Sequence, residues 1–295
     1  MVIRLKKRVA AIFALCFVLV TALLVFGAIQ RSDQTAASAA AQVGENERLL
    51  PVIMYHQLTD TASNAGPYVL TSQQFEADMR YIKSKGYTSV TTQQLIDYGN
   101  QKASLPEKPI LITFDDGYES FINYAQPILN ELDMYAVVSI IGSVAQTYTD
   151  TSDHTIRYSH LSWEAIGQLS QDPHVEIGNH TYNLHTLDQG RRGCAIKSGE
   201  EVGAYKTMLT ADLTKTQDLI AKYTGSPAKT FAYPFGAKCS QSEEVLRDMG
   251  FQVVLTCAEK INHITDQSTD WLYQIGRFNR PSGKTSEQFF QKILV

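Results

Sequence analysis

Cysteines are few in the chain after residue 31. They are Cys194, Cys239 and Cys257, an odd number without CxxC or CxxH spacing. This pattern therefore implies neither a zinc ribbon nor a disulfide framework. A single bridge between Cys239 and Cys257 and three unpaired thiols are both compatible with it.

Basic residues are also scarce once the N-terminal segment is set aside. The whole chain carries 26 Lys and Arg against 30 Asp and Glu, and five of the basic residues but none of the acids lie within residues 1–31. The remainder therefore has 21 basic and 30 acidic residues, a net charge of −9. A segment with this negative charge is not expected to bind nucleic acid or to be attracted electrostatically to anionic lipid. Hydrophobic residues make up 44% of the whole chain, which is the content of an ordinary globular protein.

A long hydrophobic run occurs at the N-terminus. Residues 9–29 are interrupted only by Thr21 and Gly27, and four basic residues precede them within positions 4–8. The length and the flanking charge predict a transmembrane signal anchor with a cytoplasmic N-terminus and the rest of the protein outside the cell. The alternative is secretion after cleavage near Ala37-Ser38-Ala39, although cleaved signals usually have an apolar region of only about 7–15 residues.

These features predict four segments. They are a basic cytoplasmic tail (1–8), the anchor (9–29), a linker rich in Ala, Ser and Gln (30–50) and one globular domain (51–295). We expect the anchor to attach this domain to the membrane, and nothing in the sequence indicates an obligate protein partner.

Strand and helix patterns alternate through the globular domain. Short apolar runs predict strands at 51–55, 88–90, 110–114, 135–141, 175–177, 230–233, 251–255 and 272–275. Helical patterns lie between them, including 121–132 (bent at Pro127), 200–223, 242–249 and 286–294, whereas 142–159 is expected to be a long loop. Alternation of this kind predicts parallel βα units, and about seven of them favour an irregular α/β barrel of the (β/α)7-8 kind over two domains.

Two acids follow the most apolar strand pattern. Ile110-Leu-Ile-Thr-Phe114 runs directly into Asp115, Asp116 and Gly117. Active-site groups of α/β barrels lie at the carboxyl ends of the strands, and neighbouring strand residues point to opposite faces. One acid can therefore hold a metal while the other faces a substrate. A simple turn or a helix cap is the alternative for such a triplet.

Histidines occupy two further predicted strand ends. His56 follows the first strand, and His180 and His185 follow the strand at 175–177. Two histidines and a carboxylate suit a divalent first-row ion with positions left for water and substrate. A spacing of five is wrong for one helix face, so a loop would have to aim both imidazoles inward. Hydrogen-bonded loop histidines are the plainer alternative.

Three motifs together resemble a known family. Thr113-Phe-Asp-Asp-Gly117, His180-Thr-Tyr-Asn-Leu-His185 and Ala232-Tyr-Pro-Phe-Gly236 are similar to the successive motifs of the polysaccharide deacetylases, carbohydrate esterase family 4. The resemblance extends over about residues 51–280, and the combination is far more specific than any one motif. Pro51-Val-Ile-Met-Tyr-His56 and the histidine spacing are most similar to the branch of poly-N-acetylglucosamine (intercellular adhesin) deacetylases.

The resemblance implies a role for each motif residue. It implies that Asp116, His180 and His185 bind the metal, that Asp115 is the general base and that His56 is the general acid. It further implies an oxyanion contact from the backbone of Phe235. Tyr182, Tyr233 and Pro234 are candidate substrate contacts, and Trp163 is another aromatic that could stack on a sugar, although core packing is the commoner fate of aromatic side chains.

The chain departs from the wider family at two points. Ala232 replaces the arginine that many members carry in the third motif, and no Leu-x-His pattern is recognisable near the C-terminus. Arg277 is our candidate for the missing positive charge beside the catalytic aspartate, with a surface arginine as the alternative.

We therefore expect a metal-dependent N-deacetylase acting outside the cell on a glycan that contains N-acetylglucosamine, either peptidoglycan or poly-N-acetylglucosamine. Zn²⁺ is the expected metal, and Co²⁺, Ni²⁺ or Mn²⁺ are alternatives. A catalytically silent glycan-binding protein on the same fold and a polysaccharide O-acetyl esterase are the other hypotheses. A glycosidase ranks low, because adjacent acids at one strand end are poorly placed to flank a glycosidic bond at about 5–9 Å separation.

Overall fold

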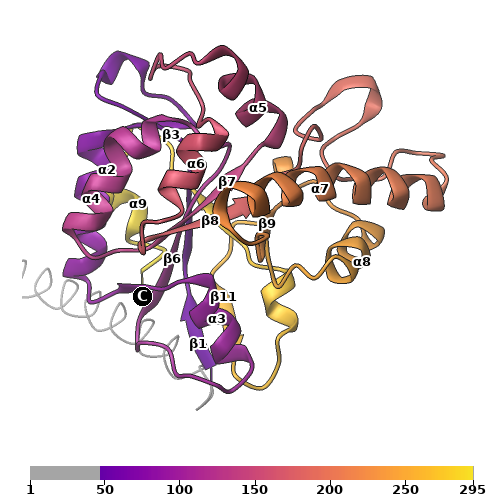
Figure 1. The fold of residues 1–295 in the computed structure, drawn as a ribbon. Helices are drawn as coiled ribbons and strands as arrows, with labels where there is room; N and C mark the ends of the chain where they lie inside the picture. The colour runs from indigo at the N-terminus through magenta and orange to yellow at the C-terminus, as the bar shows by residue number, and fades with distance from the viewer. Residues whose placement is uncertain (1–46, 295) are drawn as a thin grey trace, which may run out of the picture. The chain divides into compact units, whose positions relative to one another are not determined.

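A computed structural model describes residues 47–294, and their fold is built around one parallel sheet (Figure 1). The strand order is β10-β9-β8-β7-β6-β2-β12, with β5 pairing the start of β6, and every pairing is parallel. The strands are β2 (Val52–Tyr55), β5 (Thr88–Ser89), β6 (Pro109–Phe114), β7 (Ala136–Ile140), β8 (Val175–Asn179), β9 (Thr230–Ala232), β10 (Val253–Leu255) and β12 (Phe278–Asn279). This is the parallel α/β architecture expected from the alternating pattern.

The sheet curls without closing into a full barrel. Between its two ends, the described residues form only an isolated bridge from Leu255 to Ile275. The strand expected at 272–275 is therefore wrong: Asp270–Tyr273 forms a 3-10 turn (η5) instead. The barrel is incomplete on this side.

Helices cover the outside of the sheet (Figure 1). They are α2 (Ser72–Ser84), α3 (Thr92–Gly99), α4 (Gln126–Glu131), α5 (Gly142–Thr151), α6 (Trp163–Leu169), α7 (Val202–Thr224), α8 (Ser240–Asp248) and α9 (Ser286–Phe290). Short turns are η1 (Ala62–Asn64), η3 (Asp188–Gly190) and η4 (Pro234–Gly236). The long helix α7 ends at Gly225, whose φ of 90° is the left-handed conformation that glycine adopts readily.

Two helical segments differ from the prediction. The helix expected at 121–132 begins as a π-helical turn, η2 (Phe121–Ala125), and becomes α4 at Gln126. Pro127 lacks an N–H, so the regular hydrogen-bond ladder cannot run through it. The loop expected at 142–159 begins as α5. The hydroxyl groups of Thr147, Thr149 and Thr151 donate to backbone carbonyls four residues back. These bonds satisfy the threonine hydroxyls within the helix, and a search for apolar periodicity does not detect them.

Two small sheets flank the main one. β1 (Glu47–Leu50) pairs antiparallel with β11 (Asn262–Thr265), and β3 (Gln57–Thr59) pairs parallel with β4 (Val69–Thr71). β1 corrects the predicted boundary, because residues 47–50 belong to the folded domain rather than to the linker. The predicted tail, anchor and most of the linker lie outside the described residues. Within residues 47–294, no helix combines the length and apolarity needed to cross a membrane.

Alternating residues of β6 explain where the first aspartate points. Ile110, Ile112 and Phe114 pack under the helices of the outer face, whereas Leu111 belongs to a second core cluster with Val52, Val137 and Leu255 inside the curl. Side chains two positions apart in a strand point to the same face, so Thr113 and Asp115 lie on the same inner face as Leu111. The strand therefore delivers Asp115 to the inside of the sheet at its carboxyl end.

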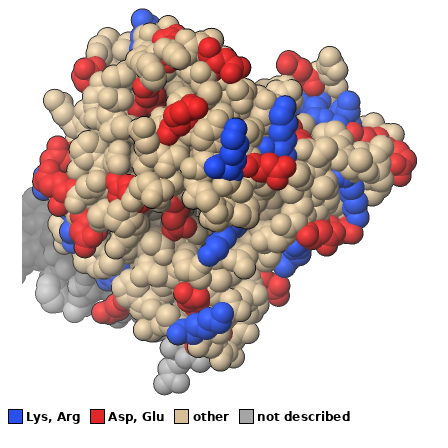
Figure 2. Space-filling view, viewed as in Figure 1, with Lys and Arg blue, Asp and Glu red and all other residues tan. Residues whose placement is uncertain are grey.

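A buried ion pair fastens the last segment of the chain to α2. Arg280, just after β12, donates from Nε to Asp78 Oδ2 at 2.8 Å and from Nη2 to Oδ1 at 3.0 Å, and Tyr55 Oη donates to Oδ2 at 3.1 Å. Both charged side chains are fully buried. On the surface shown in Figure 2, acidic and basic side chains lie interspersed, as on an ordinary protein surface.

Candidate active site

A pocket of about 540 Å³ lies at the carboxyl ends of β2, β6 and β8. It brings together seven of the residues singled out in the sequence: His56, Asp115, Asp116, His180, His185, Phe235 and Arg277. The parallel register explains part of this meeting. Tyr55 pairs with Phe114, so the next residues, His56 and Asp115, leave neighbouring strands side by side.

Three of these side chains fit a metal ion. Asp116 Oδ1 lies 3.5 Å from His180 Nε2 and 3.5 Å from His185 Nε2, and the candidate ligand atoms all lie within 4.8 Å of one another. Asp116 Oδ1 is buried and makes no hydrogen bond within the described residues. Ligands about 2.0–2.2 Å from a tetrahedral ion stand about 3.3–3.6 Å apart. The donor set and its spacing therefore suit a divalent first-row ion.

The orientation of the imidazoles suits the same role. His180 Nδ1 lies 2.7 Å from the carbonyl oxygen of Ala232, which can only accept, so Nδ1 carries a proton and Nε2 is the nitrogen that faces Asp116. Burial alone would lower the pKa of His180, but the carboxylates of Asp115 and Asp116 outweigh it and raise the pKa, so a metal ion would displace a proton from Nε2. Burial lowers the pKa of His185, which favours the neutral imidazole that metals bind.

Backbone strain is concentrated at this site. Asp116, Thr181 and Phe235 have φ values of 72°, 71° and 56°, in the left-handed region that non-glycine residues disfavour. Such residues cost on the order of 1–3 kcal/mol each and persist where the surrounding structure fixes them. Each of the three follows the end of a strand and redirects the chain so that a motif side chain enters the pocket.

Asp115 is held by Arg277. The guanidinium donates from Nη1 to Oδ1 at 2.7 Å and from Nη2 to Oδ2 at 2.8 Å, and both side chains are buried. Burial alone would raise the pKa of Asp115, but the positive charge and hydrogen bonds of Arg277, together with the neighbouring imidazoles, outweigh it and hold the pKa well below its ordinary value. Arg277 thus supplies the positive charge beside Asp115 that the motif arginine, replaced here by Ala232, would otherwise provide. Each carboxylate oxygen of Asp115 still has a lone pair available for a further hydrogen bond.

His56 lines the same pocket from the end of β2. Its ring contacts Tyr68 edge-on, with centroids 4.9 Å apart, and its Nδ1 makes no hydrogen bond within the described residues. Burial lowers the pKa of His56, although the carboxylates of Asp115 and Asp116 act in the opposite direction. The resting imidazole is therefore neutral near pH 7.

The third motif contributes one side of the pocket through Phe235. Its ring lies beside His185, with centroids 4.4 Å apart, and its backbone N–H makes no hydrogen bond to another described residue. A Cβ on Gly236 would lie 2.8 Å from Cys257 Cβ, so only glycine allows this turn to pack so closely. The turn leaves a backbone donor available at the pocket.

The other aromatic candidates and Pro234 do not line the pocket. Tyr233 is buried and its hydroxyl lies 3.0 Å from Ser242 Oγ, and Pro234 is buried behind Gly193. Tyr182 lies under the ammonium group of Lys215, 3.7 Å from the ring centroid. None of these three predicted substrate contacts lines the pocket, and Trp163 is a core residue.

Several pocket residues were not predicted from the sequence to belong to the site. They are Met54, Tyr68, Tyr118, Arg192, Cys257, Glu259 and Asn279. Tyr118 follows the Asp115-Asp116-Gly117 strand end directly and was the one with a local signal. The cysteines of the described chain, Cys194, Cys239 and Cys257, are all free thiols, so the bridge considered from the sequence is not formed among them.

A family model described as polysaccharide deacetylase matches residues 102–254, more than half of the chain. Two curated relatives are named poly-β-1,6-N-acetyl-D-glucosamine N-deacetylase. The protein from Escherichia coli strain K12 is 22% identical over 261 residues, which cover 82% of this chain and 38% of that protein. The protein from Staphylococcus aureus strain MSSA476 is 25% identical over 205 residues, covering 69% of this chain and 66% of its own length. The chain thus spans less than two thirds of these relatives.

Solved structures show the same fold. IcaB from Ammonifex degensii has a TM-score of 0.68 at 24% identity, covering 84% of this chain and 98% of that one. A de-N-acetylase from Aggregatibacter actinomycetemcomitans has a TM-score of 0.70 at 23% identity, covering 84% of this chain and 100% of that one. Together with the match to the family model, these findings identify the group to which the sequence is related. The chain belongs to the polysaccharide deacetylase family.

Proposed function

We propose that this protein is a metal-dependent hydrolase that removes N-acetyl groups from an extracellular polysaccharide containing N-acetylglucosamine. One observation carries the proposal: a metal-type triad of Asp116, His180 and His185 shares a pocket with a carboxylate, Asp115, that Arg277 keeps ionised. A divalent ion held by the triad would polarise the acetamide carbonyl and lower the pKa of a water molecule toward about 7. Zn²⁺ suits this donor set best, with Co²⁺, Ni²⁺ or Mn²⁺ as substitutes.

Asp115 acts as the general base in this proposal. It is a carboxylate at working pH and accepts a proton from the attacking water through a lone pair that Arg277 does not use. The backbone N–H of Phe235 donates to the acetamide oxygen as negative charge develops on it. His56 donates a proton to the departing sugar amine. Because its imidazole is neutral at rest, it must acquire that proton during the reaction, and the source is the proton that Asp115 has taken from the attacking water.

The relatives' names support the choice of substrate. Proteins named for deacetylation of poly-β-1,6-N-acetyl-D-glucosamine match 82% and 69% of this chain. We therefore infer that poly-β-1,6-N-acetylglucosamine is the substrate in preference to peptidoglycan. The silent glycan-binding hypothesis rested on the missing motif arginine and on the missing C-terminal histidine, and the pairing of Arg277 with Asp115 removes the first of these reasons.

We further propose that the apolar run at 9–29 anchors the protein in the cell membrane, with residues 1–8 in the cytoplasm and the catalytic domain outside. Secretion after cleavage near Ala37 remains the alternative. An extracellular position would bring the pocket to a secreted or cell-surface glycan.

Acetate release tests the proposed reaction. We expect the purified protein to release acetate from β-1,6-linked N-acetylglucosamine oligomers, and a chelator to abolish the release until zinc is restored. Asp115→Asn should lower kcat by about 10²–10⁴-fold while metal stays bound, because only the proton acceptor is lost. Asp248→Asn, an exposed change on α8, is the matched control.

Two outcomes of the same assay would count against the proposal. Acetate release from O-acetylated xylan but not from any N-acetylated glycan would make the protein an esterase. Failure of the metal-loaded protein to release acetate from every acetylated glycan would refute deacetylation altogether.

A further inference from the structure

The segment Thr181-Tyr182-Asn183 carries the chain from the first histidine of the site to the second. The imidazole of His180 is fixed by its own hydrogen bond to the carbonyl of Ala232. No side-chain hydrogen bond to another described residue fixes the imidazole of His185 in the same way. The position of His185 therefore depends on the path of the backbone that leads to it.

On one side, this segment is bound by the first turn of α5. Gly142 N donates to the carbonyl of Thr181 and Ser143 N to the carbonyl of Tyr182, both at 2.9 Å. The approach is close: a Cβ at Gly142 would lie 2.7 Å from Tyr182 Cδ2 and 2.7 Å from Thr216 Oγ1. Only glycine lets the end of α5 reach these carbonyls.

On the other side, a carboxylate of α7 binds the same peptide units. Asp212 Oδ1 accepts from Tyr182 N at 2.8 Å, and Asp212 Oδ2 accepts from Asn183 N at 2.9 Å. Lys215, three residues further along α7, places its ammonium group over the Tyr182 ring. Both oxygens of one carboxylate are thus used on consecutive backbone N–H groups, which fixes the direction of the segment as well as its position.

We propose that Asp212 is a positioning residue for the metal site: it sets where His185 stands relative to His180 and Asp116. The wide spacing between the two histidines requires a loop with a defined shape, and the strained Thr181, with φ of 71°, needs outside contacts to persist. Asp212 and the end of α5 supply these contacts from opposite sides. This inference rests on the metal-binding role of the proposed function.

Metal affinity tests the inference. Zinc binding to the purified full-length protein is measured by competition with a chromophoric chelator, and Co²⁺ binding by its visible absorption. We expect Asp212→Ala to weaken zinc binding by about 10–100-fold and to change the Co²⁺ spectrum, as loss of groups that orient metal ligands does elsewhere. Asp212→Asn keeps one acceptor and should fall between. Asp218→Asn, an exposed change on the same helix, is the matched control and should bind like the unmutated protein.

A second variant approaches the segment from the other side. Gly142→Ala leaves Asp212 intact, pushes on Tyr182, and should also weaken zinc binding. If Asp212→Ala is folded by circular dichroism and binds zinc as tightly as Asp218→Asn, the inference is wrong. If the unmutated protein itself binds neither zinc nor cobalt, the proposed metal-dependent function is wrong. This result differs from one in which only the positioning role of Asp212 is refuted.

Discussion

Asp115 and Arg277 are buried, oppositely charged and 162 positions apart in the sequence. The aspartate was visible in the sequence because it ends an apolar strand beside a second acid, and its motif carries the family resemblance. The residues around Arg277 form no recognisable motif. The arginine was proposed only because Ala232 replaces the arginine that many family members carry. Only the parallel pairing of β12 with β2, and of β2 with β6, brings the two together.

Removing Arg277 should cost stability in a way that depends on Asp115. We expect Arg277→Met to lower the free energy of unfolding by about 3–5 kcal/mol, because it leaves a buried carboxylate without its partner. The double variant Arg277→Met, Asp115→Asn should recover part of this loss, since no unpaired charge remains. Urea unfolding of the four proteins gives the coupling. A double variant as unstable as the sum of the two single ones would contradict the pairing described here.

Helices and strands with a clear periodic pattern of apolar residues were predicted better than those built mainly from polar residues. The strands β2, β6, β7 and β9 and the long helix α7 lie close to their expected ranges. Helix α5 was missed because its sequence is rich in Thr and Ser, whose side-chain bonds to the helix backbone are invisible to a hydrophobic pattern. The miss matters, since the first turn of α5 supports the segment before His185.

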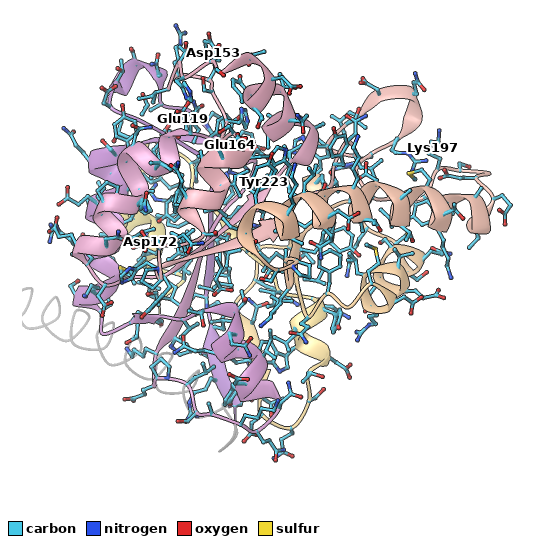
Figure 3. The ribbon with its side chains drawn as sticks, in the orientation of Figure 1. Glu119, Asp153, Glu164, Asp172, Lys197 and Tyr223 are labelled. Atoms are coloured by element: carbon cyan, nitrogen blue, oxygen red, sulfur yellow. The ribbon has the colours of Figure 1, made fainter. Side chains whose placement is uncertain are left out.

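The connection between α6 and β8 provides a pH-dependent contact between elements. Asp172 accepts from Gln126 Nε2 at 2.6 Å and Asn130 Nδ2 at 2.8 Å, and from His174 N at 2.9 Å (Figure 3 labels Asp172). Burial alone would raise the pKa of Asp172, but these hydrogen bonds outweigh it and lower the pKa below the ordinary value. The resulting stability is therefore complete above the unfolded-state pKa of about 3.9 and is lost as the pH falls through the folded-state value.

Asp172→Asn tests this contact. At pH 7 we expect the variant to unfold with a free energy about 1–2 kcal/mol lower than that of the unmutated protein, because hydrogen bonds to a charged acceptor are lost. The difference should shrink as the pH is lowered below about 4, because the carboxyl group of the unfolded chain takes up a proton there and that of the folded protein follows only at lower pH. Asp248→Asn serves as the exposed control. A difference that stays constant between pH 7 and pH 3 would show that ionisation of Asp172 does not contribute.

For the whole molecule, the alternation of strands and helices was enough to predict a parallel α/β sheet with an irregular barrel. It did not predict where the barrel stays open, because the apolar pattern at 272–275 indicated a strand, whereas the chain forms a 3-10 turn there and only an isolated bridge joins Ile275 to Leu255. The family model covers residues 102–254, which contain Asp115, Asp116, His180 and His185 but neither His56 nor Arg277. The end of β2 supplies His56, and Arg277 directly precedes the edge strand β12, so the complete site depends on this end of the sheet as well as on the matched segment.

The proposed reaction depends on one divalent ion held between Asp116, His180 and His185. A crystal of the protein grown with zinc, with diffraction recorded at the zinc absorption edge, tests for this ion. We expect one strong anomalous peak in the pocket, about 2.0–2.2 Å from an oxygen of Asp116 and from Nε2 of each histidine. A zinc-saturated crystal without a peak between these three side chains would rule out the proposed metal site.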